Sequence, residues 1–160
     1  MSNAKYWIDR LELMPHPEGG YYKEVYRSSD TTSHPEHSKK RNLATSIYFL
    51  LEGENISHFH ELSSDELWYY HDGQGADIHV FNEGKHQSYQ LSKASDGQLQ
   101  VLIPAHSEFA AEVIDQKGYV LIGCVVTPGF DFEDFRMLKK GEMLEKHPDY
   151  ATLIERFCVE

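Results

Sequence analysis

Cysteine is scarce in this sequence, which has only Cys124 and Cys158 among its 160 residues. Two cysteines are too few for a disulfide scaffold. A chain of this length buries roughly 70% of its unfolded surface on folding, which is enough for a core without disulfides. Cys124 lies inside an apolar segment and is expected in that core. Because nothing here requires an oxidising compartment, the cysteine content favours a cytoplasmic protein.

Long apolar segments are also missing. No stretch approaches the roughly 18 apolar residues that a membrane-spanning helix needs. The first residues lack the apolar centre of a secretory signal peptide. We therefore expect a cytoplasmic protein that has no membrane partner.

Positive charge is in short supply. Lys and Arg number 15 against 26 Asp and Glu, so the net charge is −11. Nucleic acids and anionic membranes both attract positive charge, so this balance argues against nonspecific binding to either. The notable basic residues are Arg27 and the run from Lys39 to Arg41, and of these Arg41 is the one expected to reach a ligand.

Short segments of strand-like sequence fill most of the chain. They are rich in β-branched and aromatic residues, and Gly, Asn, Asp or Pro separates them. No helical crossover joins them, so we expect antiparallel sheets in a sandwich or barrel, forming one domain over residues 1–160 with its core at about 19–135. The predicted strands are residues 21–27, 45–51, 56–61, 66–71, 77–82, 86–91, 99–103, 108–114 and 119–127.

The two ends of the chain read as short helices. Asn3 can cap a helix that runs to about Leu13. Near the other end, Pro148 suits the first turn of a helix over about 148–157. Its apolar residues recur at helical spacing, so this helix is expected to pack on the outside of the barrel.

The pattern that carries chemistry is His58, His60 and Glu66. Residues two apart on a strand point to the same face, so the two imidazoles are expected to project together. If Glu66 begins the next strand, its carboxylate can face them. Two imidazoles and one carboxylate suit a divalent transition metal with open positions. Alternatively, His60 acts as a general base and Glu66 orients it.

Other side chains near this pattern are candidates for ligand binding. Aromatic rings can form a platform for a sugar ring, and Arg41 and the hydroxyls can contact polar groups at the barrel mouth. By contrast, the histidines in polar loops, including His16, are expected at the surface. The candidate ligand-binding residues are Arg41, Thr45, Tyr48, Ser57, Trp68 and Tyr70.

Several motifs resemble the cupin superfamily of jelly-roll barrels. His58-x-His60 followed by a Glu and a Gly is similar to the first cupin motif, and members of the superfamily often bind a metal through three His and one Glu. In this sequence the fourth ligand would fall near Phe109, which cannot bind a metal. A tighter resemblance is to a cupin group similar in fold to dTDP-4-dehydrorhamnose 3,5-epimerase. It rests on residues 17–22, 45–51 (TSIYFLL), 57–60 (SHFH), 64–68 (SDELW) and 128–135 (PGFDFEDF).

This resemblance implies a double-stranded β-helix, or jelly roll, with a cavity for a small molecule, and a homodimer. Three functions follow from the resemblance and the residues together. The first is an isomerase or epimerase that acts on a carbohydrate-like or nucleotide-linked ligand through His60 and Glu66. The second is a metal-dependent enzyme that uses His58, His60 and Glu66. The third is a binding module that performs no chemistry.

Overall fold

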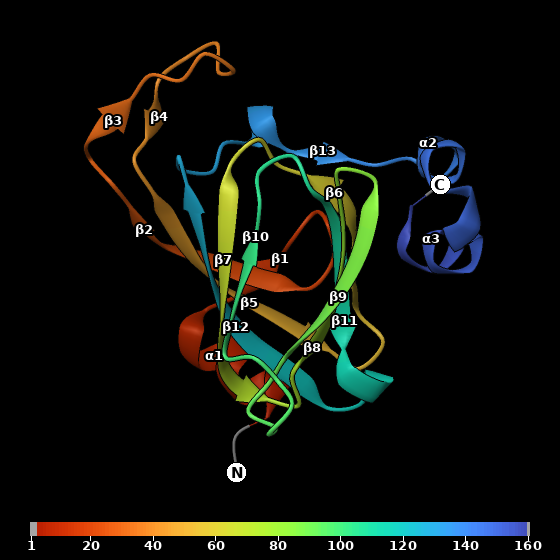
Figure 1. Ribbon diagram of the computed structural model, residues 1–160. Helices are drawn as coiled ribbons and strands as arrows, with labels where there is room; N and C mark the ends of the chain where they lie inside the picture. The colour runs from red at the N-terminus through yellow and green to blue at the C-terminus, as the bar shows by residue number, and fades with distance from the viewer. Residues whose placement is uncertain (1–2, 160) are drawn as a thin grey trace.

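The computed structural model describes residues 3–159. Two antiparallel sheets lie face to face and enclose the core, as expected for a jelly roll (Figure 1). The first sheet has the spatial order β1 (Met14–Pro15), β2 (Tyr21–Arg27), β5 (Thr45–Glu52), β12 (Tyr119–Thr127), β7 (Asp65–Gly73), β10 (Gln100–Ile103). The second has the order β13 (Arg136–Met137), β6 (Ile56–Glu61), β11 (Glu108–Val113), β8 (Ala76–Asn82), β9 (Lys85–Leu91).

The main core lies between the two sheets. It contains Phe49 and Ile122 from the first sheet and Ile78 and Phe109 from the second, all nearly inaccessible to solvent. These residues come from strands in which alternate positions face inward. The all-β prediction is therefore confirmed, and the predicted strands match the observed ones to within two residues.

Helix α1 (Ala4–Leu11) covers the outer face of the first sheet at β5 and β12 (Figure 1). The Asn3 side chain accepts a hydrogen bond from the backbone N–H of Tyr6, so the predicted cap is present. The helix ends at Leu11 because Glu12 adopts a left-handed conformation with φ of 56°. Ala4 and Leu13 pack against Leu50 and Leu121 of the sheet.

Helices α2 (Lys140–Lys146) and α3 (Ala151–Phe157) cover the outer face of the second sheet (Figure 1). Ile154 and Phe157 pack there against Phe59 and Phe81. The predicted C-terminal helix begins as the 3-10 turn η3 (Pro148–Tyr150), and α2 was not predicted. Two further 3-10 turns are η1 (Ile114–Gln116) and η2 (Phe132–Asp134).

A small hairpin, β3 (Thr31–Thr32) with β4 (Arg41–Asn42), projects from one end of the barrel (Figure 1). No helix within residues 3–159 is both long enough and apolar enough to span a membrane.

Candidate functional site

A cavity of about 440 Å³ opens between the two sheets at the end where β5 and β7 begin and β12 ends. Its wall combines charged groups with aromatic rings, so it can offer both hydrogen bonds and a stacking surface. The lining residues are His16, Glu18, Tyr22, Glu24, Arg27, Thr45, Ile47, Phe49, His60, Leu62, Glu66, Trp68, Cys124, Val126, Phe130, Asp131, Phe132 and Phe135.

A β-bulge in β6 decides which residues of this strand face the cavity. His60 pairs with Phe109 of β11, and Ser57 pairs with Ala111. Two residues of β6 therefore oppose the single residue of β11 that lies between these pairs. Phe109 and Ala111 both belong to the core, and residues paired across a ladder share a face, so Ser57 and His60 point inward.

The bulge separates His58 from His60. Phe59 points outward into the cluster under α3. The His58 imidazole bonds instead through Nδ1 to the backbone carbonyl of Glu18, at 2.9 Å, and His58 does not line the cavity. The prediction that the two imidazoles share one face is therefore wrong, because the extra residue breaks the alternation of the strand.

His60 contacts Glu18 and not the predicted Glu66. Its Nε2 lies 2.7 Å from Oε2 of Glu18, and its Nδ1 lies 2.7 Å from the carbonyl oxygen of His58. A carbonyl and a carboxylate only accept hydrogen bonds, so both ring nitrogens act as donors and the ring is an imidazolium. Burial is the largest single effect and would lower the pKa of His60, but the charge and hydrogen bond of Glu18, together with the charge of Glu66 and the His58 carbonyl, outweigh it and the pKa is raised.

The carboxylate of Glu18 is held in its ionised form, which matches the imidazolium. Burial alone would raise the pKa of Glu18, but the charge and hydrogen bond of His60 outweigh burial and lower it. Both side chains are almost fully buried, at 3% and 7% exposure, so each depends on the other for compensation of its charge. The two therefore form a buried ion pair in the cavity wall.

The loop between β1 and β2 carries Glu18 to this position. The backbone N–H and the Nδ1–H of His58 both donate to the carbonyl of Glu18. Gly19 follows with φ of +111°, and a Cβ on it would lie 2.0 Å from the carbonyl oxygen of Ile56. Only glycine fits so close to a neighbouring strand in this conformation.

His16 belongs to the same loop and lines the cavity, although the sequence predicted a surface position. Its Nδ1 accepts the backbone N–H of Glu18 at 3.1 Å, which leaves Nε2 as the protonated nitrogen of a neutral ring. Burial lowers the pKa of His16, and the charge of His60 lowers it further against the opposing effect of Glu18. His16 and Glu18 are among the cavity residues that sequence reasoning missed.

Glu66 lies in the cavity wall as predicted, at the start of β7. It is 7% exposed, and its Oε2 has no hydrogen-bond partner within residues 3–159. Burial raises the pKa of Glu66 to about 7; the nearby Glu18 raises it too, and His60 opposes both. The cavity therefore contains one carboxyl group that exchanges its proton near neutral pH.

Two of the predicted ligand-binding residues, Thr45 and Trp68, line the cavity. The hydroxyl of Thr45 also accepts the backbone N–H of Phe130 at 2.9 Å, which fixes the segment above the cavity. The indole N–H of Trp68 is buried beside the carboxyl of Glu66, and this contact lowers the pKa of Glu66 against the larger opposing effect of burial.

The other four predicted ligand-binding residues lie away from the cavity wall. Tyr48 packs under α1 on the outer face of β5. The hydroxyl of Tyr70 donates to the carbonyl of Gly73 at the far end of β7. Ser57 is fully buried, and its side chain helps to lower the pKa of Glu18.

Arg41, the fourth of these, is a structural residue. It is 3% exposed and makes a two-pronged contact with Asp134, 2.8 Å from each carboxylate oxygen. It also contacts Glu133 at 3.2 Å. Arg41 therefore joins the β3–β4 hairpin to the connector 128–135, whose Phe130, Phe132 and Phe135 cover the cavity.

The donor atoms do not fit the metal site that the superfamily implies. Among the described residues, no three His, Cys, Asp or Glu side chains are arranged to hold a metal ion. The predicted set of His58, His60 and Glu66 does not converge, because His58 points to the Glu18 carbonyl and Nε2 of His60 is engaged by the Glu18 carboxylate.

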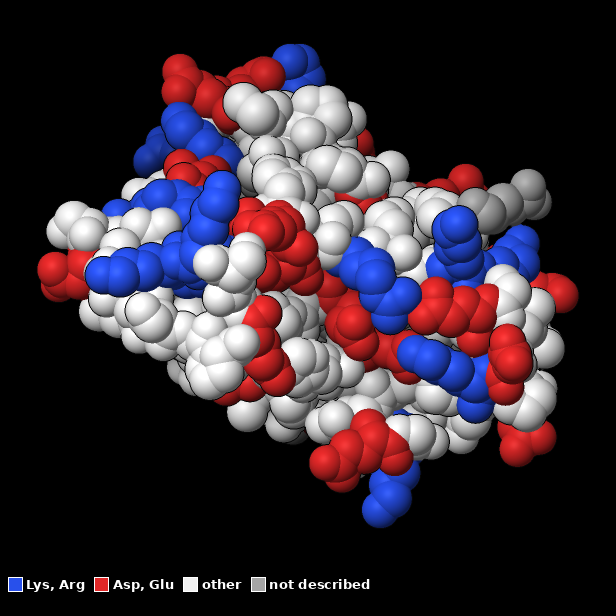
Figure 2. Space-filling model, turned by 90° about the horizontal axis from the view of Figure 1, so that it is seen from above, with Lys and Arg blue, Asp and Glu red and all other residues white. Residues whose placement is uncertain are grey.

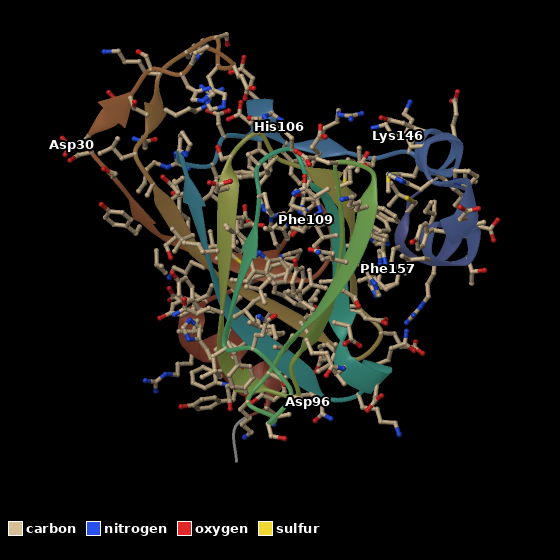
Figure 3. All side chains as sticks on the ribbon, viewed as in Figure 1. Asp30, Asp96, His106, Phe109, Lys146 and Phe157 are labelled. Atoms are coloured by element: carbon tan, nitrogen blue, oxygen red, sulfur yellow. The ribbon has the colours of Figure 1, made fainter. Side chains whose placement is uncertain are left out.

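The fourth ligand position of the superfamily is apolar here. Phe109 packs against His60 with ring centroids 4.1 Å apart, and Figure 3 shows it inside the barrel. His106, the nearest histidine in sequence, lies at the outer end of the barrel in the same view and contacts Glu36 at 2.9 Å. The cavity therefore lacks the ligand set through which the superfamily holds a metal.

Comparison with known proteins agrees with this fold. A Saccharomyces cerevisiae protein, "Uncharacterized protein YML079W", is 31% identical over 161 residues, covering 91% of this chain and 80% of that protein. A hypothetical protein from Leishmania major is 34% identical with a TM-score of 0.93, covering 99% of this chain and all of that one. Protein SO0799 from Shewanella oneidensis is 36% identical with a TM-score of 0.89, covering 99% of both chains. The family described as "Cupin superfamily (DUF985)" matches residues 5–138, and the chain therefore belongs to the cupin superfamily.

Proposed function

We propose that the cavity binds a small carbohydrate-like ligand and moves a proton next to its carbonyl group, which is the chemistry of a sugar isomerase. The observation that carries this proposal is Glu66, a buried carboxyl in the cavity wall with a pKa of about 7. A general base works best when its pKa lies near the working pH, because it is then both available and able to release the proton again.

In this reaction Glu66 is the base. A C–H bond beside the substrate carbonyl breaks, the proton passes to a carboxylate oxygen of Glu66, and the electron pair moves onto the carbonyl oxygen. The protonated Glu66 then returns the proton to the former carbonyl carbon, while the hydroxyl group on the deprotonated carbon passes its own proton to the oxyanion and becomes the new carbonyl. One carboxyl group suffices when the proton leaves and returns on the same side of the sugar. Tyr22 also lines the cavity and is available to deliver the proton when it returns from the opposite side.

His60 then acts as a fixed positive charge. Both of its N–H groups are occupied, so it has no free lone pair with which to abstract a proton. Its charge favours the negative charge that develops on the substrate oxygen. Glu18 keeps His60 protonated. The sequence predicted His60 as the base and Glu66 as its partner, whereas here Glu66 is the base and His60 supports it.

Deuterium exchange tests this proposal. The protein is incubated in D₂O with keto-sugars and, separately, with their phosphate esters, and NMR follows deuterium entering the carbon next to the carbonyl. Glu66→Gln keeps the size of the side chain and removes the base, so exchange is expected to fall by about 100-fold or more.

Glu112→Gln is the matched control. Glu112 is also buried, at 6% exposure, but it contacts Arg156 on α3 outside the cavity. This variant should exchange at the wild-type rate. Exchange that survives Glu66→Gln would refute the role of Glu66. A ligand that binds and returns unchanged would favour a binding module.

A further inference from the structure

The charges around the cavity bear on the class of ligand it accepts. Acidic side chains outnumber basic ones in the wall. The acidic lining residues are Glu18, Glu24, Glu66 and Asp131, whereas the cationic ones are His60 and Arg27. No lysine in residues 3–159 lines the cavity.

Both cations in the wall are already paired. Nε2 of His60 lies 2.7 Å from Oε2 of Glu18. Arg27 is neutralised by Glu24 at 2.5 Å. Glu66 and Asp131 have no cationic partner of this kind in the wall, so the cavity carries an excess of negative charge when Glu66 is ionised.

Arg27 also lacks the free donors that an anion needs. Its Nε–H and one Nη2–H donate to Glu24, and its two Nη1–H groups donate to the side chain of Asn42 and the carbonyl of Phe130. A guanidinium has five N–H groups, so one remains. A phosphate is best recognised by two parallel donors. Arg41, in the β3–β4 hairpin, is buried against Asp134, and Arg136, on β13, is held by Glu61 and Glu142.

The middle of the outer surface at this end of the molecule is also acidic (Figure 2). Figure 2 looks onto the end of the molecule where the β3–β4 hairpin projects, and acidic side chains run across its middle between two basic groups. With a net charge of −11, the molecule also repels anions at longer range.

We propose that the cavity selects an uncharged polyhydroxylated ligand, such as a free sugar, and excludes phosphate esters and nucleotide-linked sugars. The proposal rests on the function proposed above and narrows its substrate class. Aromatic rings at the rim provide a surface for such a ligand. The ring centroids of Phe130 and Phe132 lie 4.8 Å apart, and both side chains line the cavity. Sugar rings stack on such side chains without requiring charge.

Charged thiol reagents test the sign of the cavity without requiring a substrate or a reaction. Phe132→Cys places a thiol at the rim, where the native side chain is 54% exposed. Leu99→Cys places one beside β10, at a position 60% exposed that does not line the cavity. Each variant is treated separately with two methanethiosulfonate reagents, one carrying a cationic trimethylammonium-ethyl group and the other an anionic sulfonatoethyl group. Peptide mass mapping then identifies the labelled cysteine.

For each variant, the labelling rate with the cationic reagent is divided by the labelling rate with the anionic reagent. This ratio should be about fivefold higher for Phe132→Cys than for Leu99→Cys, and comparing the two variants cancels the intrinsic reactivities of the reagents. Adding Glu66→Gln at about pH 8 should reduce this ratio, and about 1 M salt should reduce it too. Equal ratios, or a ratio that favours the anionic reagent at the rim, would overturn the proposal.

Matched pairs of a free sugar and its phosphate ester provide the second test, by isothermal titration. D-fructose with D-fructose 6-phosphate and D-ribulose with D-ribulose 5-phosphate are suitable probes. Any pair that binds should favour the free sugar by at least about tenfold, and an ester that binds more tightly than its parent would overturn the proposal. If neither member of a pair binds, the thiol ratio decides. Loss of deuterium exchange bears only on the reaction, so the two proposals fail separately.

Discussion

The raised pKa of Glu66 predicts how the stability of the protein depends on pH, and this prediction requires no substrate. Its pKa is about 7 in the folded protein against 4.5 for an ordinary glutamate. Between these values the folded state holds a proton that the unfolded chain has released. The free energy of unfolding therefore falls as the pH rises from about 4.5 to about 7.

The size of this effect follows from the interval between the two pKa values. At about 1.4 kcal/mol for each pKa unit, the burial of Glu66 costs about 3 kcal/mol above neutral pH. Glu66→Gln resembles the protonated side chain and removes this cost. Relative to the wild type, its free energy of unfolding should rise by about 2 kcal/mol between about pH 5 and about pH 8.

Urea denaturation at a series of pH values measures this difference, with the fluorescence of the buried Trp68 as the signal. Glu112→Gln should not reproduce the rise, because Glu112 is compensated by Arg156. A difference between Glu66→Gln and the wild type that stays constant with pH, or that falls, would refute the account of Glu66.

Further predictions concern the surroundings of the cavity. Glu18→Gln should lower the pKa of His60, because the charge of Glu18 then no longer opposes burial, and an NMR titration of the imidazole would show an unchanged pKa if the ion pair were absent. Gly19→Ala should destabilise the fold by about 2–3 kcal/mol in denaturation, because its Cβ meets the Ile56 carbonyl; a neutral effect would contradict the geometry of the loop. Arg41→Ala should cost about 3 kcal/mol by leaving a buried carboxylate unpaired, and a loss well under about 1 kcal/mol would count against its structural role. The homodimer expected from the sequence remains a prediction, supported by exposed Val25 and Tyr26 on β2, and light scattering should give twice the 18.5 kDa of one chain.

The strands could be predicted because their information is local. Alternation of side chains and Gly, Asn, Asp or Pro at the turns identify each strand without knowledge of its partners. The same local reasoning placed Glu66 at the start of a strand and in the cavity. It also placed Thr45 and Trp68 there, since both belong to strands whose inward positions form the core.

The partner of His60 could not be predicted in this way. Glu18 lies 42 residues earlier in the chain and comes from a loop without periodic pattern. The available signal was the run of residues 15–20, in which two prolines and two glycines surround His16 and Glu18. Such a run fixes a loop tightly, and charged residues held in a rigid loop deserve consideration as site residues. The bulge in β6 has no sequence signature of its own, so the orientation of His58 could only be seen in the structure.

Because of the additional residue in β6, the reactive groups inside the barrel can change while the strands of the barrel stay the same. Without His58, Ser57 and His60 would still face inward and Phe59 outward, so the sheet would tolerate a strand shorter by one residue. The backbone carbonyl of Glu18, however, would lose both of its hydrogen-bond donors on β6. Changing the length of a single strand by one position could thus replace one set of reactive groups by another inside the same jelly roll.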